Sequence, residues 1–430
     1  MKKILLFLIL SLLLAACLPQ DVQMPQSPLL RLLERKSGLI AYIGADWNVY
    51  VSDQGGGNRI ALTDDAVLPQ TQGDAFRIYQ TLAWSADGKR LGFVGISGEG
   101  DQRTSELFIA NIDEEKANKV YSSATENPFY LYWSPDNQHL SFLSTAASGQ
   151  TFLLQSISAE SGNRLILDSG SPYYWSWAPN GKVMIVHSGN PNSTVPEHLA
   201  FLRMDTEIIE DGVEIIPASF QAPAWSPDGS RILLPRRNEQ NEKEIVLLDS
   251  SGAFEKTLGT FRVSTSFAWS PDSTLVAYID GNTPLTAGSL GTLHVVDLTT
   301  SEDFFQDEDV AAMFWSPNSR KLAYFKPFVI GTEGSDSGTQ QLILQLNMLD
   351  TVSGESRELF TFRPTDQFLD IIPYIDQYHQ SVTIWSPDSN NLVLSFLTDE
   401  GEAGIAVVAA SGRLEPRLLA PGYLAFWSWR

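Results

Sequence analysis

The chain contains a single cysteine, so it can form no intrachain disulfide. Basic residues are also scarce, because 29 Lys and Arg stand against 51 Asp and Glu, which gives a formal charge of −22. This balance argues against nucleic-acid binding, since contacts to phosphates need clustered Lys and Arg. Only five His occur, none in a His-x-x-x-His pattern, and there is no glycine-rich phosphate loop.

Long apolar runs are missing too, with one exception at the N-terminus. Residues 4–14 are almost purely apolar and follow Lys2 and Lys3, but they are too short for a transmembrane helix of about 20 residues. The run ends in Leu-Ala-Ala-Cys17, which resembles a bacterial lipobox. This resemblance implies that a signal peptidase cleaves before Cys17, which becomes the lipidated first residue of the mature protein. The alternative is a cleaved secretory signal with an incidental cysteine.

We therefore expect a signal peptide over residues 1–16, and the lipidated Cys17 with a tether and a short helix over 17–37. The expected location is the cell envelope, lipid-anchored on the extracytoplasmic side, either on the outer face of a cytoplasmic membrane or in an outer membrane facing the periplasm. Acyl chains contribute about 0.8 kcal/mol per buried CH₂, so two or three of them make a stable anchor. The globule itself is acidic and should be repelled by an anionic lipid surface.

What the chain does contain is a repeat. Trp-Ser-Pro-Asp-Gly or a close variant recurs at intervals of 42 to 49 residues, apart from one interval of 70 residues before Trp385. The repeated tryptophans are Trp84, Trp133, Trp177, Trp225, Trp269, Trp315, Trp385 and, in a truncated copy, Trp427. This spacing is typical of one four-stranded blade of a β-propeller. Pro and Asp followed by Gly, Asn or Ser suit a tight turn between the first two strands.

The strand pattern predicts an all-β fold, an eight-bladed β-propeller over residues 38–430, with seven blades as the runner-up. Each motif ends one strand and is followed by three more, but only seven complete sets of three follow the eight motifs. The eighth set of three lies at the N-terminus, over 38–63. Pairing these strands with the C-terminal strand that ends at Trp427 closes the ring and removes open sheet edges. The repeated Trp and Asp are therefore interpreted as architectural.

The Trp-Ser-Pro-Asp-Gly repeats are similar to the WD40-like repeats of the TolB family of Tol–Pal translocation proteins and to the propellers of prolyl oligopeptidases. The resemblance implies a propeller over essentially the whole mature chain, and propellers host many unrelated activities. TolB-like proteins carry an α/β domain before a six-bladed propeller, whereas only about 20 residues lie between Cys17 and the first strand here. The peptidases need a hydrolase domain, for which no residues remain, and no Gly-x-Ser-x-Gly motif occurs.

No catalytic or metal-binding constellation emerges from the sequence. His187 and His198 flank one loop and are interpreted as residues of its rim. Acidic clusters such as 113–115 and 307–309 lack the alternating pattern of a calcium loop, so no cofactor is expected, although weak Ca²⁺ binding stays open.

Binding residues are expected on the face that carries the loops between second and third strands and the connections from one blade to the next, because these vary most in length. Connection 363–381 is the longest and is rich in aromatic and aliphatic residues. The candidate contact residues on this face are Phe76, Tyr79, Phe129, Tyr130, Tyr173, Tyr174, Phe368, Tyr374 and Tyr378. Exposed aromatics among acidic residues suit a protein or a glycan. The alternative is that 363–381 folds back as a helix or lid and plugs the central channel.

The leading hypothesis is a membrane-anchored binding scaffold with a protein or cell-wall glycan partner and no nucleic acid. Two alternatives stay open. One is an enzyme that uses the channel, such as a metal-assisted glycan hydrolase or lyase. The other is a sensory or envelope-assembly subunit.

Overall fold

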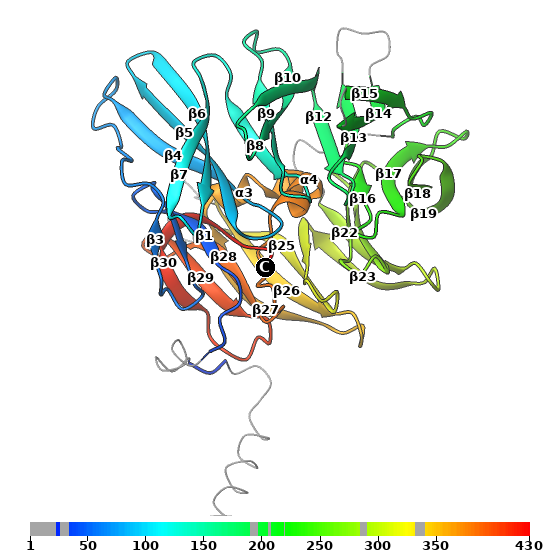
Figure 1. Cartoon of the computed structure of the whole chain (residues 1–430). Helices are drawn as coiled ribbons and strands as arrows, with labels where there is room; N and C mark the ends of the chain where they lie inside the picture. Colours follow the sequence, from blue (N-terminus) through cyan, green and yellow to red (C-terminus); the bar gives the residue numbers. More distant parts are fainter. Residues whose placement is uncertain are drawn as a thin grey trace, which may run out of the picture.

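The structure is a computed structural model, and it describes residues 23–25, 34–189, 197–204, 208–218, 220–283, 290–331 and 340–430. The predicted signal peptide, Cys17 and most of the tether lie outside these residues. Antiparallel sheets dominate the described part, and Figure 1 shows them arranged around a common centre. The prediction of an all-β, propeller-like fold is confirmed.

Five of the sheets have four strands each, in simple meander order. The first is β4 (Phe76–Trp84), β5 (Arg90–Glu99), β6 (Gln102–Asn111) and β7 (Lys116–Ser123). The second is β8 (Pro128–Trp133), β9 (His139–Thr145), β10 (Phe152–Ser158) and β11 (Arg164–Gly170). The third is β12 (Tyr173–Trp177), β13 (Val183–Gly189), β14 (Glu197–Met204) and β15 (Ile208–Gly212). The fourth is β16 (Ala224–Trp225), β17 (Arg231–Arg237), β18 (Lys243–Asp249) and β19 (Phe254–Thr260). The fifth is β20 (Ser264–Trp269), β21 (Leu275–Gly281), β22 (Gly291–Asp297) and β23 (Asp303–Val310).

The remaining strands form one ten-stranded sheet that joins the two ends of the chain. In spatial order it contains β24 (Ala312–Trp315), β25 (Lys321–Gly331), β26 (Gln340–Asp350), β27 (Ser356–Pro364), β28 (Asn391–Leu397), β29 (Ala403–Ala409), β30 (Arg417–Trp427), β1 (Ile40–Gly44), β2 (Val49–Ser52) and β3 (Ile60–Ala61). Two short helices and a 3₁₀ turn, described below, interrupt it after β27.

Strand β30 serves two neighbours. Its first part pairs with β29, from Arg417 opposite Val407. Its last part pairs with β1, with Ile40 opposite Trp427 and Tyr42 opposite Ala425. The N- and C-terminal strands therefore lie side by side, as the sequence predicted.

The repeated tryptophans end the strands nearest the centre. Several of these strands contact their counterparts in the next sheet, as β4 does with β8 and β16 with β20. Six indole N–H groups donate to a backbone carbonyl of the preceding repeat or of the N-terminal segment. The pairs are Trp84 with Phe426, Trp133 with Ala83, Trp269 with Ala224, Trp315 with Ala268, Trp385 with Phe314 and Trp427 with Ser37, at 2.7 to 3.2 Å. The repeated Trp therefore holds adjacent sheets together.

The Ser-Pro-Asp turns repeat one set of hydrogen bonds. In the turn after Trp225, Ser226 Oγ donates to Asp228 Oδ1 at 2.6 Å and accepts from the Arg231 N–H at 2.9 Å. Gly229 closes the turn with φ +74°, a value that Gly adopts without steric cost. Where a serine takes this position, as Ser319 does, its Oγ accepts from the Asp272 N–H of the previous turn at 3.0 Å. The turns are thus linked to one another as well as braced internally.

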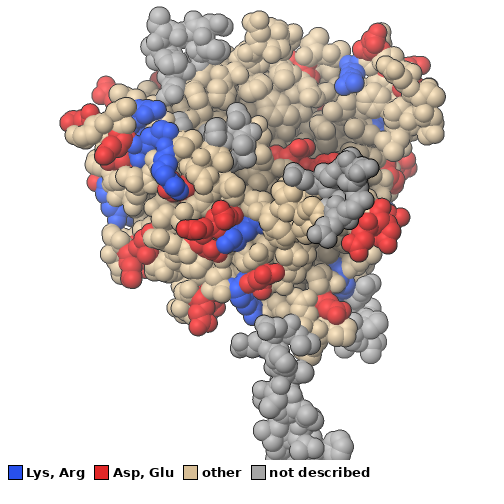
Figure 2. Space-filling model, turned by 180° about the vertical axis from the view of Figure 1, so that it is seen from behind, with Lys and Arg blue, Asp and Glu red and all other residues tan. Residues whose placement is uncertain are grey.

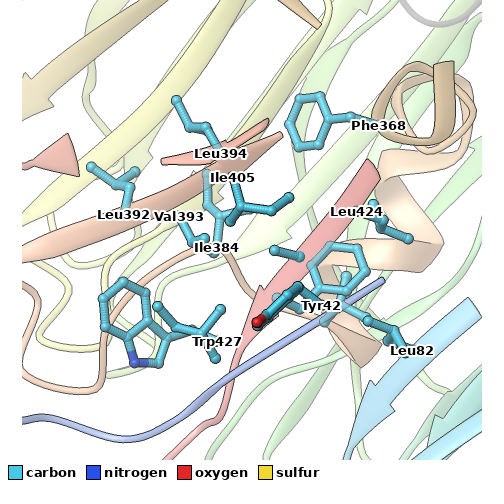
Figure 3. Close-up of a cluster of buried hydrophobic side chains, with 14 of the residues drawn as sticks. Tyr42, Leu82, Phe368, Ile384, Leu392, Val393, Leu394, Ile405, Leu424 and Trp427 are labelled. Atoms are coloured by element: carbon cyan, nitrogen blue, oxygen red, sulfur yellow. The ribbon is translucent and has the colours of Figure 1, made fainter. Parts of the chain in front are cut away.

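The largest hydrophobic cluster lies where the chain ends meet. Figure 3 shows side chains from β1, β28, β29 and β30 packed together, among them Tyr42, Val393 and Trp427. The same cluster includes Phe368 from the connection after β27. This cluster joins the first strand, the last strand and the long connection in one core.

Candidate functional site

Connection 363–381 folds into the centre of the ring. It forms α3 (Asp366–Leu369), the 3₁₀ turn η2 (Ile372–Tyr374) and α4 (Ile375–Ser381). Thr365 caps α3, since its side chain accepts from the Phe368 N–H, and its Oγ1 donates to Tyr423 O at 2.6 Å. Figure 1 shows α4 at the centre of the ring of sheets, and α4 contacts the inner strands β8, β12, β20 and β24. The structure therefore supports the expectation that this segment folds back as a plug.

Apolar side chains hold one face of the plug. Phe368, Ile371, Ile372 and Ile375 are all at least 90% buried. From one turn to the next, these residues are three or four positions apart, which is the spacing of one face of a helix. The segment therefore forms helical turns, whereas the rest of the chain forms strands.

Polar side chains of α4 bind backbone groups of the inner strands. Gln377 is the most extensively bonded, because its Oε1 accepts from the Trp175 N–H at 3.3 Å and its Nε2 donates to Trp175 O at 2.9 Å. Tyr130 O–H donates to the Gln377 carbonyl at 2.9 Å. An inner strand has no further strand on its central side, so its backbone groups need such partners.

Three more contacts join α4 to the fourth and fifth repeats. Asp376 Oδ2 accepts from the Ala222 N–H at 2.8 Å, and Gln380 Nε2 donates to Pro223 O at 3.1 Å. His379 Nε2 donates to Phe267 O at 2.9 Å. Helix α4 is thus hydrogen-bonded to the second, third and fifth sheets, and to the segment that leads into the fourth.

Burial dominates the electrostatics of the plug. It raises the pKa of Asp376 to about 7, although the hydrogen bond from Ala222 favours the charged form. Burial also raises the pKa of Tyr174, which lies near Asp376 and Tyr374. It lowers the pKa of His379 to about 4. An acid and a base of the same helix are thus both biased toward their neutral forms.

The structure places the predicted aromatics in very different environments. Tyr374 is the one that is well exposed, at 48%. Partly buried are Phe76, Phe129, Tyr174 and Tyr378; fully packed are Tyr79, Tyr130, Tyr173 and Phe368. Six of the nine lie in strands β4, β8 and β12 and not in connections, so their placement in loops was wrong.

The structure brings four of these aromatics to α4 and leaves the others apart. Tyr130 and Tyr378 pack edge to face at 5.0 Å, and Tyr174 lies near Tyr374 beside Asp376. Phe129 packs on Phe152 instead. In β4, Tyr79 O–H donates to Asp65 at 2.5 Å. We call Tyr174, Tyr374 and Tyr378, together with the buried Asp376, the axial aromatic group.

Sequence reasoning missed the polar residues of the plug. Asp376, Gln377 and His379 carry most of its contacts, and the signal that could have found them is the helical spacing of the apolar residues just before. The view of His187 as a rim residue was also wrong. It is fully buried in β13, where its ring stacks on Phe220 at 4.8 Å and its Nδ1 hydrogen-bonds with Gln221 O at 3.1 Å.

The described residues contain no group of three or more His, Cys, Asp or Glu that could hold a metal ion. Figure 2 shows acidic side chains spread over one face, several of them beside basic ones. Asp307, from one of the acidic clusters, accepts from Lys326 at 2.8 Å and from Tyr324 at 2.7 Å. Within the described ranges, no helix is long and apolar enough to cross a membrane.

Comparison with known proteins identifies the fold and no family. No protein-family model matches the chain, and no curated protein is significantly similar in sequence. Among solved structures, the dihydro-heme d1 dehydrogenase NirN matches with a TM-score of 0.54 and 14% identity over 96% of this chain and 78% of its own. A prolyl endopeptidase matches with a TM-score of 0.53 and 12% identity over 80% of this chain, which spans about half (49%) of that enzyme.

TolB from Acinetobacter baumannii is also similar, with a TM-score of 0.38 and 13% identity over 84% of this chain and 86% of its own, a likeness too low to carry an argument. The matches include enzymes, and identities at this level report architecture alone. By its sheets and the similarities with TM-scores above 0.5, the chain has a β-propeller-like fold.

Proposed function

We propose that the protein is a lipid-anchored, extracytoplasmic binding scaffold, an eight-bladed propeller that holds a protein or cell-wall glycan partner at the axial aromatic group. The anchor is the lipidated Cys17, and the location is the cell envelope. The role is binding and not catalysis.

The count of eight blades is supported by the repeated tryptophans. Six of them end the inner strands β4, β8, β12, β16, β20 and β24. The seventh blade consists of the bridge of Trp385 to Leu392, then β28, β29 and the first part of β30. The eighth consists of the last part of β30 with β1, β2 and β3. The ring is closed by this pairing of the two chain ends.

The observation that carries the binding role is the plug itself. A helix hydrogen-bonded to four inner strands or their entering segments fills the centre, where a propeller enzyme would need room for its substrate. The plug leaves Tyr374 exposed on a rigid support, beside the partly exposed Tyr174. An aromatic side chain with a polar tip, held rigidly, loses little entropy when a partner covers it.

The experiment that tests the role is cross-linking and affinity recovery of the tagged protein from its native membranes, with sedimentation on purified cell-wall glycan in parallel. The test variant is Tyr374→Ala. The matched control is Phe254→Ala, because Phe254 is equally exposed, at 46%, but lies on the outer strand β19.

We expect the partner to be lost with Tyr374→Ala and kept with Phe254→Ala, while both variants melt within about 1 °C of the unmodified protein because surface truncations alter stability little. Equal recovery with both variants would place the contact elsewhere. Stoichiometric metal in the purified protein, with turnover of a glycan, would replace the binding role by the enzymatic alternative.

A further inference from the structure

The chain just after the lipid attachment site is bound to the propeller. The Met24 N–H donates to Arg413 O at 2.8 Å, and the Glu415 N–H donates to Met24 O at 3.0 Å, so Met24 forms a parallel bridge with Leu414. Gln23 Nε2 donates to Leu359 O at 3.1 Å. We call residues 23–25 and the loop 410–416 the tether clasp.

A second set of contacts holds the chain again before β1. Glu34 forms an ion pair with Arg417 at 2.9 Å, and that arginine is only 6% exposed and also donates to Gln54 O. Ser37 Oγ accepts from the Asp388 N–H at 3.1 Å, and its carbonyl accepts from the Trp427 indole at 2.7 Å. The segment before the first strand is therefore attached at both of its described ends.

The tether clasp lies at the end of the blades that carries the Ser-Pro-Asp turns. The Ala410 N–H donates to Asn390 O within the turn after Trp385, and loop 410–416 begins there. The plug and the β28–β29 loop, which contains Glu400, lie at the other end of the same strands, since the Thr365 N–H donates to Ser395 O near the end of β28. Strand β28 has seven residues, so about 23 Å separates the two ends.

Chain length then limits how far the clasp can stand from the lipid. Gln23 is the sixth residue after Cys17, and six residues of chain span at most about 21 Å. The clasp and its surroundings also carry apolar side chains suited to lipid contact. Met24 in the clasp is 44% exposed, and Val352 in the neighbouring β26–β27 turn is 78% exposed. Two basic residues, Arg413 and Arg320, are also exposed near the clasp and balance the exposed Glu355 and Glu415. The whole molecule, by comparison, has a formal charge of −22.

We infer that the tether clasp fixes the orientation of the propeller on the bilayer. The corner formed by Met24, loop 410–416 and the turn at Val352 faces the lipid headgroups, and the axial aromatic group points away from the membrane. This inference rests on the proposed lipid anchor and adds to it a lipid-facing surface. It also means that this corner of the globule lies against the headgroups, although the acidic composition alone predicted repulsion from an anionic lipid surface.

The experiment measures energy transfer from a protein-bound fluorophore to acceptor-labelled headgroups in vesicles of phosphatidylcholine and phosphatidylglycerol. The full lipidated chain is used, because Cys17 is its only cysteine and its thiol is occupied by lipid, so one added cysteine is labelled alone. The two sites are Val352→Cys at the clasp and Glu400→Cys at the opposite end, both exposed.

We expect at least twofold more transfer from position 352 than from position 400. Met24→Pro removes the N–H that bonds Arg413 O and should bring the ratio toward one, whereas Met24→Leu keeps the bond and the ratio. Equal transfer from both sites, in protein that floats with the vesicles, overturns the orientation and leaves the anchor intact. If the Cys17→Ser variant co-floats with the vesicles as well as the unmodified chain does, the proposed lipid anchor is wrong. The proposed orientation is then wrong as well.

Discussion

At the scale of single residues, the eight repeated tryptophans are not equivalent. Trp269 is 6% exposed and its indole donates to Ala224 O at 2.9 Å. Trp225 is only partly buried, and within the described residues its indole N–H has no hydrogen-bond partner; the same holds for the N–H of the buried Trp177. The sheets on either side of the one that contains β12 are therefore joined to it without this indole hydrogen bond.

This difference predicts unequal costs for two chemically identical substitutions. Trp269→Ala should lower the free energy of unfolding by about 3–5 kcal/mol, because it opens a cavity between sheets and leaves a carbonyl unpaired. Trp225→Ala should cost roughly half as much, since part of that side chain is already in water. Denaturant unfolding of both variants measures the difference, and equal costs would show that the indole hydrogen bond contributes little.

Asp376 predicts a pH dependence with a definite sign. Its pKa in the folded protein is about 7, above the ordinary value of 3.8, so the folded state holds the proton more tightly than the unfolded chain. Between these values the unfolding free energy should fall as pH rises, by up to about 1.4 kcal/mol per pH unit. His187 and His379 act in the opposite sense, because burial lowers both pKa values to about 4 and protonation on acidification destabilises the fold.

The contribution of Asp376 is isolated by Asp376→Asn, which keeps an oxygen for the Ala222 N–H. The variant should gain stability relative to the unmodified chain as pH rises from 5 to 7, and the gain should level off above that. Thermal melts across this range give the difference curve. A flat curve would show that the carboxyl is solvated in solution.

At the scale of elements, the plug is held by a few polar contacts that replace strand pairing. Gln377 is only 3% exposed, and its amide bonds both backbone groups of Trp175. Gln377→Ala should therefore cost about 2–5 kcal/mol, because it leaves two buried backbone groups unsatisfied. Tyr374→Ala, one turn earlier and exposed, should cost less than about 0.5 kcal/mol.

Hydrogen exchange at the Trp175 and Ala222 amides checks this prediction locally. Both amides should exchange faster in Gln377→Ala if α4 leaves the centre as a unit. Unchanged protection together with unchanged stability would mean that apolar packing around Phe368 alone holds the plug.

At the scale of the whole molecule, the decisive contact joins the two ends of the chain. Strand β1 pairs with β30 over five positions, and the surrounding cluster contains Tyr42, Val393 and Trp427. Deletion of residues 420–430 removes that partner and exposes the edge of β1, which is a template for association. Deletion of residues 1–22, by contrast, touches none of the described strands.

We expect the C-terminal deletion to form oligomers in size-exclusion chromatography and to lose its cooperative melt, whereas the N-terminal deletion stays monomeric. A monomeric C-terminal deletion that melts within roughly 3 °C of the unmodified chain would contradict closure of the ring by these strands.

Much of this architecture could be predicted from the sequence, because its signals are local. The spacing of Trp84, Trp133 and their counterparts marks the ends of the inner strands, and Ser-Pro-Asp turns need only neighbouring residues to form. The candidate site was predicted less well. The varying length of the connections and their aromatic content favoured exposed loops at Tyr130 and Tyr173, yet both side chains are packed in strands.

By itself, then, the sequence determined the repeat, the turns and the presence of a long apolar connection, since each depends on residues close together in the chain. Only the tertiary structure decided how Ile40 registers with Trp427, that Gln377 meets Trp175, and that Met24 meets Leu414. These partners lie roughly 200 to 390 residues apart, and a single sequence contains no periodic signal for contacts of that range.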